Sequence, residues 1–185
     1  MIFTLPMSKN SLNFMSMRVI YILLVNLCLV AFHPVYAEET DSNTAAAHAA
    51  VNGERANLLI YAMSLIGTAY KYGGNSPQTG MDCSGFVGYV FSNAAGLQLP
   101  RSADEISKTG ETVDEQDLRP GDLVFFDTMK RAFSHVGIYL GEHRFIHAPS
   151  SRSGNIMISD MKEKYWSQRF EGARRLLRLP LPDNH

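Results

Sequence analysis

The hydrophobic pattern changes its period along the chain, from helical spacing in the first half to strand-like spacing in the second. Apolar residues recur on one helical face over residues 58–66 and again over 86–94. Residues 123–126 then form a continuous apolar run, and residues 135–140 alternate as a half-buried strand does. Further strand-like segments lie at 156–158 and 173–177. Helices followed by strands predict one α+β domain with an antiparallel sheet.

The N-terminus has the organisation of an export signal. Residues 1–18 contain Lys9 and Arg18 and no acidic residue, and an apolar run of 14 residues follows from Val19 to Phe32. Small residues precede a cleavage point after Ala37, so we predict a signal peptide over 1–37 and export to the periplasm or the outside. A retained membrane anchor is the alternative, but the run is shorter than the ~20 residues of a membrane-spanning helix. We therefore expect no stable anchor after cleavage.

The rest of the chain divides into a lead-in, a domain and a tail. Residues 38–53 are rich in Ala, Thr and Asn without periodicity, which predicts a flexible lead-in. The domain is predicted over 54–180 and a short tail over 181–185. The chain has 17 Lys and Arg against 18 Asp and Glu, so its formal charge of −1 provides no basic field for nucleic acid. We expect a monomer that binds no nucleic acid.

Cleavage after Ala37 leaves the chain with a single cysteine. Cys28 lies inside the apolar run and is removed with it, whereas Cys83 remains. A lone thiol in an oxidising compartment is typical of an intermolecular bridge or of a reactive group, and the alternative is a small buried apolar residue. Turn-forming residues precede Cys83 and a helical pattern follows it, so we expect it at a helix N-terminus. The helix dipole and free N–H groups there would lower the pKa of the thiol and hold an oxyanion.

Two histidines are expected to meet in the predicted sheet. A hairpin centred near Gly141 and Glu142 would place His147 opposite His135, or within about a residue or two of it. With Cys83, the pair would supply a nucleophile, a base and an orienting group. A zinc site is the competing interpretation, but no ligand spacing resembles a structural site and His143 on the turn is poorly placed. We expect His143 to be exposed, and no metal or cofactor.

The order of short motifs resembles the NlpC family of bacterial cell-wall cysteine peptidases. The resemblance implies a papain-like core in which the cysteine opens a helix packed on an antiparallel sheet. It implies Cys83 as the nucleophile, His135 as the general base and His147 as the polar third member. The motifs are Tyr70-Lys71-Tyr72-Gly73-Gly74, Asp82-Cys83-Ser84-Gly85-Phe86, Leu99-Pro100-Arg101-Ser102, Pro120-Gly121-Asp122-Leu123, His135-Val136-Gly137-Ile138-Tyr139, Phe145-Ile146-His147-Ala148, and Tyr165-Trp166 with Gly172-Ala173-Arg174-Arg175.

Three further residues receive roles through the same resemblance. Tyr70 would line the site and help to polarise the substrate carbonyl, and Asp82 and Ser84 would line the substrate groove. Tyr70 as core packing and Asp82 as a helix cap are the structural alternatives. Gly85 would allow close approach of another chain or of a substrate, with a packing glycine as the equal alternative.

The resemblance also implies an activity, which is hydrolysis of amide bonds in the stem peptides or cross-links of peptidoglycan. The Arg101-Ser102 and Tyr165-Trp166 segments look most like small murein endopeptidases of the MepS type, which suggests cleavage of the D,D-cross-link. A γ-D-glutamyl–diaminopimelate bond is the alternative. A secreted antibacterial amidase of the same fold and a non-catalytic cell-wall-binding module are the other functions considered, and a thiol-redox protein is disfavoured because no second cysteine lies near Cys83.

Overall fold

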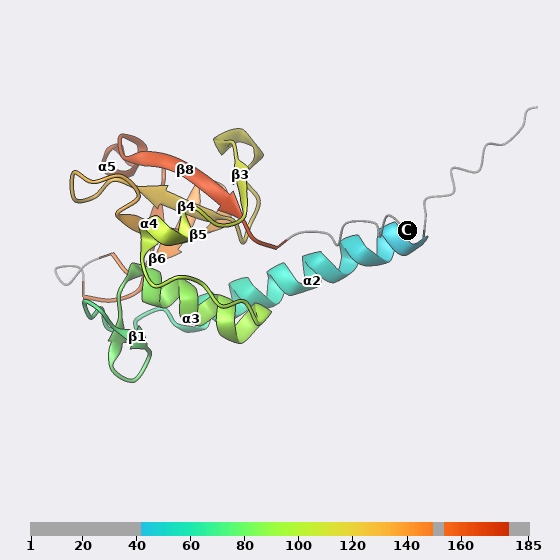
Figure 1. Ribbon diagram of the computed structural model, residues 1–185, viewed down its shortest axis with the longest axis horizontal. Coiled ribbons are helices and arrows are strands. Elements are labelled where there is room, and N and C mark those ends of the chain that lie inside the picture. The colour runs from blue at the N-terminus through green and yellow to red at the C-terminus, as the bar shows by residue number, and fades with distance from the viewer. Residues whose placement is uncertain (1–41, 150–153, 178–185) are drawn as a thin grey trace, which may run out of the picture. The chain divides into compact units, whose positions relative to one another are not determined.

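The structure is a computed structural model that describes residues 42–149 and 154–177 (Figure 1). The predicted signal peptide, the first residues of the lead-in and the predicted tail lie outside this part of the chain. Within the described residues, no helix has the length and apolar character needed to span a membrane.

The first described helix, α2, begins earlier than the sequence pattern predicts. It covers Ser42–Ser64, whereas we expected a flexible lead-in over residues 38–53 and a helical apolar face only over residues 58–66. Alanine-rich sequence favours helix without any need for an apolar stripe, and most residues of this first stretch are exposed, including His48. An exposed helix has no burial periodicity, which is why the pattern did not reveal it.

Helix α3, Cys83–Ala95, follows the predicted boundaries. Asp82 is its N-cap, with an extended backbone and a side chain that accepts a hydrogen bond from the Gly85 N–H. Gly96 ends the helix in the left-handed conformation that favours glycine there. The helix buries an apolar face made by Phe86, Val87, Val90 and Phe91.

The second half of the chain forms a fully antiparallel six-stranded sheet in the order β3-β8-β4-β5-β6-β7. The α+β prediction is confirmed. Strand β4 has the expected bounds, while β3 and the small β1–β2 pair were not anticipated. The strands are β1 (Asn75–Ser76), β2 (Gly80–Met81), β3 (Glu111–Val113), β4 (Leu123–Phe126), β5 (His135–Gly141), β6 (Arg144–His147), β7 (Met157–Asp160) and β8 (Phe170–Arg175), and the short helices are α4 (Ala103–Ile106), η1 (Glu115–Asp117) and α5 (Lys164–Ser167).

Both faces of the sheet are covered, which explains the uninterrupted apolar run of β4. Leu123 and Phe125 join the cluster that includes the buried residues of α2 and α3, which lie on one side of the sheet in Figure 1. Val124 and Phe126 point the other way, into a second cluster that contains Phe145 and Trp166. Alternate side chains of one strand therefore serve two cores.

The β5–β6 hairpin turns at Glu142 and His143, which both have positive φ angles of 50° and 60°. Two left-handed residues in succession are typical of the two-residue turns that match strand twist. Ile138 pairs with Ile146, so continuation of the register brings His147 opposite Gly137, two residues from His135. This agrees with the predicted juxtaposition, and His143 is exposed as expected.

Candidate active site

Cys83 is the first residue of α3 and directly follows the Asp82 cap. Backbone packing fixes this helix start, because a Cβ added at Gly85 would collide with the carbonyl oxygen of Gly74. The glycine therefore serves close packing of the chain on itself, and not access for another molecule.

The electrostatic setting of the thiol differs from the sequence prediction. Burial raises the pKa of Cys83, and the neighbouring Asp82 carboxylate raises it further. The backbone N–H groups of Val136, Ser84 and Cys83 itself act in the opposite direction but do not outweigh burial. We expected the helix start to lower this pKa. The observed setting keeps the resting thiol protonated, so a base is required to activate it.

The two histidines form a buried relay. His135 Nε2 and His147 Nδ1 are 2.8 Å apart, and His147 Nε2 lies 2.9 Å from Ser159 Oγ. If His135 is to accept a proton on Nδ1, its neutral ring must carry its hydrogen on Nε2 and donate to His147. His147 then donates from Nε2 to Ser159. The two contacts are compatible with the tautomer in which Nδ1 of His135 is the free basic nitrogen.

Burial keeps this histidine pair uncharged. His135 is 3% exposed and His147 is fully buried. Desolvation lowers the pKa of His135 to about 4. The pKa of His147 falls well below its ordinary value because of burial and its proximity to His135. Neutral imidazoles at neutral pH are the form that can accept a proton.

Trp166 of α5 holds the pair in place. Its ring stacks on His135, with centroids 5.5 Å apart and planes 28° apart, and meets His147 edge-on at 4.9 Å. Phe145 packs against His147 at 4.6 Å. Neither Trp166 nor Ser159 was given a role by the sequence analysis. Trp166 appeared there only as part of a family motif, and no local signal marks Ser159.

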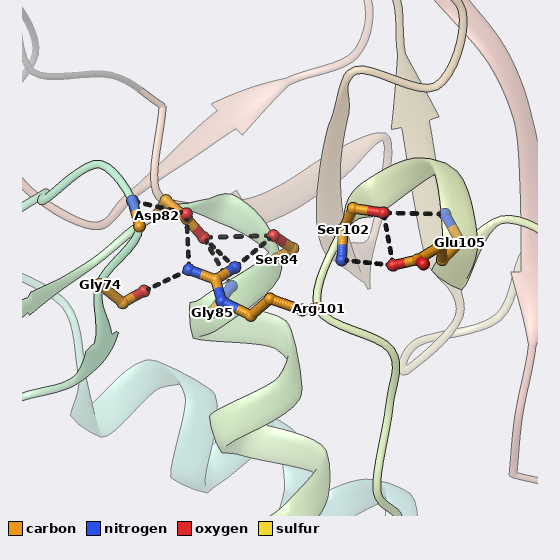
Figure 2. A network of polar contacts seen from close by, with 8 residues as sticks. Gly74, Asp82, Ser84, Gly85, Arg101, Ser102 and Glu105 are labelled. Atoms are coloured by element: carbon orange, nitrogen blue, oxygen red, sulfur yellow. Dashed lines mark hydrogen bonds and ion pairs between the residues drawn. The ribbon is translucent and has the colours of Figure 1, made fainter.

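Arg101 clamps the start of α3 through the residues that flank Cys83 (Figure 2). Its guanidinium donates to both carboxylate oxygens of Asp82 at 2.9 and 2.8 Å, to Ser84 Oγ at 2.8 Å and to the Gly74 carbonyl at 3.1 Å. Burial alone would raise the pKa of Asp82, but hydrogen bonds from Arg101 and from backbone N–H groups, with the Arg101 charge, lower it overall. The sequence analysis assigned Arg101 no function.

Asp82 is therefore the helix cap that the sequence allowed as an alternative, and it also contributes to the pocket wall. The next helix, α4, begins with a capping box in which Ser102 and Glu105 exchange hydrogen bonds, as Figure 2 shows. That cap fixes the chain directly after Arg101.

A pocket of about 730 Å³ brings all six predicted site residues together. Tyr70 also packs against the main core, so both interpretations of this residue hold in part. Burial, Cys83 and Asp82 raise the pKa of its phenol, which therefore stays protonated and able to donate. The pocket is lined by Tyr70, Tyr72, Gly73, Asp82, Cys83, Ser84, Arg101, Ser102, Ala103, Thr128, Met129, Arg131, Ser134, His135, His147, Pro149, Met157, Ser159, Tyr165 and Trp166.

The competing zinc site has no geometric support among the described residues. No group of three or more His, Cys, Asp or Glu side chains in that part of the chain is arranged to hold a metal ion. Two of the four imidazole nitrogens of His135 and His147 face each other, and a third faces Ser159. Ring nitrogens engaged in this way suit a base that is held in position by its partner.

Comparison with known proteins shows which family has this arrangement of residues. The sequence pattern described as the NlpC/P60 family matches residues 67–175, more than half of the chain and the whole of the pocket. The chain belongs to the NlpC/P60 family. Family membership confirms the resemblance inferred from the motifs.

Individual relatives agree with this assignment. The chain is 48% identical over 118 residues to a gamma-DL-glutamyl hydrolase of Bacillus subtilis, covering 63% of this chain and 28% of the relative. It is 47% identical over 114 residues to the murein DD-endopeptidase MepS/murein LD-carboxypeptidase of Escherichia coli K12, covering 60% and 57%. A crystal structure of an NlpC/P60 family protein from Bacillus cereus is similar, with a TM-score of 0.62, 31% identity, and 67% and 40% coverage. This chain spans less than two thirds of the length of these relatives.

Proposed function

We propose that the chain is a peptidoglycan endopeptidase that hydrolyses an amide bond in the stem peptide or cross-link. The proposal rests mainly on one observation: Cys83, at a helix start, lines the same pocket as a buried and uncharged His135–His147 relay. A protonated thiol beside a neutral imidazole is a nucleophile with its base. The murein endopeptidase relative supports the substrate class.

In the first half of the reaction, His135 takes the thiol proton as the Cys83 sulfur bonds to the amide carbonyl carbon. The oxyanion that forms is held by the N–H groups at the start of α3 and by the Tyr70 hydroxyl. As the intermediate collapses, the carbon–nitrogen bond breaks and His135 returns the proton to the leaving amine. The acyl group remains on Cys83 as a thioester.

In the second half, His135 removes a proton from water while the water oxygen attacks the thioester carbon. The carbon–sulfur bond then breaks, the carboxylic acid leaves, and the proton returns to the Cys83 sulfur. His147 transfers no proton to substrate and acts as a positioning residue, because its contact with Nε2 fixes the tautomer and orientation of His135.

The bond is proposed to be the D,D-cross-link, with a γ-D-glutamyl bond as the second candidate. The first agrees with the name of the MepS relative, and the second with the name of the gamma-DL-glutamyl hydrolase. We further propose that the chain acts as an exported monomer in the periplasm or outside the cell, where this polymer lies.

The decisive experiment digests purified peptidoglycan with the protein and analyses the released muropeptides by mass spectrometry. The masses and new amino termini identify the bond. The Cys83→Ala variant should release nothing while keeping the circular dichroism spectrum and unfolding midpoint of the wild type. Release at the wild-type rate by Cys83→Ala would overturn the mechanism, and an inactive wild-type chain would overturn the function.

A further inference from the structure

Exposed apolar side chains gather around the pocket. Among the described residues, seven large hydrophobic side chains are exposed, and four of them line the pocket. Scattered exposed apolar residues need no explanation, but a group around a polar reaction centre indicates a surface that contacts ligand. The four are Tyr72, Met129, Met157 and Tyr165, and the other three are Ile60, Met63 and Ile66.

Two of these residues adjoin the histidine relay. Met157 is the cross-strand neighbour of His147, in the β6–β7 pairing. Tyr165 packs edge-on against Trp166 at 4.8 Å, and Trp166 in turn contacts both histidines. We call Met157 and Tyr165 the apolar shelf. They are 40% and 47% exposed, so each presents apolar surface to the pocket mouth.

The Tyr165 ring of the shelf is held in place before any ligand arrives. The Arg169 guanidinium lies over the Tyr165 ring, 4.1 Å from its centroid, and donates to the Tyr165 carbonyl at 2.9 Å. Trp166 supports the ring from a second direction. A fixed aromatic ring loses little conformational entropy when it binds a ligand, which favours its use as a recognition surface.

The reaction geometry decides which part of the substrate reaches the shelf. The carbonyl carbon must contact the Cys83 sulfur, whereas the amine nitrogen must come within hydrogen-bond distance of His135 to be protonated. The amine component therefore extends past His135, toward the residues packed around the histidine pair. Asp82, with its partner Arg101, directly precedes Cys83 at the start of α3, so we place the acyl component beside this charged pair.

We propose that the apolar shelf binds the hydrocarbon chain of the diamino acid that supplies the amine of the scissile bond. This inference rests on the proposed function. A diamino acid that joins two stems carries an unbranched methylene chain, and the two shelf side chains have no charge that would compete with it. Amines with short side chains would leave the shelf uncovered and would bind less tightly.

The single tryptophan of the chain allows a direct test, because Trp166 adjoins the shelf and its fluorescence reports occupancy. The probes are two stem tripeptides with free amines, one ending in lysine and one in diaminopropionate, which differ only in methylene count. The lysine peptide should bind the wild type about tenfold more tightly, since burial of each methylene strengthens binding. Tyr165→Ala and Met157→Ala should reduce its affinity to that of the short peptide.

Two matched controls separate recognition from folding. Tyr165→Phe keeps the ring, and Met63→Ala removes a methionine of similar exposure (44%) from α2, so both should keep the wild-type preference. Equal binding of the two peptides by the wild type, or equal loss of both in the shelf variants, would overturn the shelf. If the preference is present but no muropeptide is cleaved, the proposed function fails and the shelf stands.

Discussion

Two groups of residues line the pocket and are stabilised in opposite ways. The charged wall consists of Asp82 and Arg101, and the aromatic wall consists of His135, His147 and Trp166. On the cysteine side, Asp82 and Arg101 keep full charges and satisfy them through an ion pair and hydrogen bonds at a partly exposed position. On the histidine side, burial among aromatic rings removes charge, so His135 and His147 stay neutral. The comparison shows that one wall fixes the nucleophile's helix in place, while the other sets the proton affinity of the base.

The largest expected effect comes from removal of the base on the aromatic wall. His135→Ala should reduce the rate of muropeptide release about a thousandfold or more, because the protonated thiol then has no acceptor. The rate should be measured by chromatography of soluble products. His143→Ala is the matched control, since that histidine lies exposed on the hairpin turn and should retain full activity. A His135→Ala rate within tenfold of wild type would show that the relay does not serve the thiol.

The second effect is loss of stability in acid. The folded-state pKa of His135 is lowered from 6.5 to about 4, so between these values the unfolded chain binds more protons and acid favours unfolding. Between pH 7 and pH 4 this residue should cost about 3 kcal/mol of unfolding free energy. Urea unfolding at both pH values measures the loss.

His135→Gln provides the control for that measurement, because glutamine does not titrate. Its loss of stability over the same pH interval should be smaller than that of wild type by about the same 3 kcal/mol. Equal losses in the two proteins would mean that His135 is not held neutral by burial. Asp82 and His147 are present in both proteins, so their own contributions to the acid loss largely cancel in this comparison.

Features of both walls that depend on neighbouring residues can be predicted from the sequence. The caps at Asp82 and Ser102 and the turn of the β5–β6 hairpin each depend on a few adjacent residues, so a short pattern predicts them. Hairpin geometry then brought His135 and His147 together without any tertiary information. These features predicted that Cys83, His135 and His147 would form one site, whereas Tyr70, Asp82 and Ser84 were assigned to it only through the family resemblance.

The remaining features depend on contacts between distant segments. Arg101 reaches back 19 residues to Asp82, and Trp166 packs on histidines from two other strands, so no local pattern encodes either contact. The predicted lowering of the Cys83 pKa was wrong for the same reason. A helix start is visible in sequence, whereas the burial that outweighs it results from packing of the whole domain.

The third effect tests the charged wall. Asp82→Ala removes the cap of α3, the acceptor for the N–H groups of Gly73 and Gly85, and the partner of Arg101. We expect a loss of about 2 kcal/mol in unfolding free energy, measured by urea denaturation at pH 7. Asp82→Asn should recover part of this loss, because its amide oxygen can still cap the helix. A loss below about 0.5 kcal/mol would show that the clamp contributes nothing beyond its charge pairing.

The smallest effect shows why the clamp differs from an ordinary ion pair. Lys108 and Asp104 approach to 2.7 Å, as close as Arg101 and Asp82, but their side chains are 68% and 48% exposed. Water solvates both charges before and after the pair breaks, so Lys108→Ala should change the unfolding free energy by no more than about 0.5 kcal/mol. The Asp82 side chain is only 13% exposed and caps a helix, so its loss leaves backbone donors unpaired. If Lys108→Ala and Asp82→Ala lost the same unfolding free energy in one urea series, the contribution of Asp82 would come from its charge alone. The expected fourfold difference attributes it to the hydrogen bonds that Asp82 accepts.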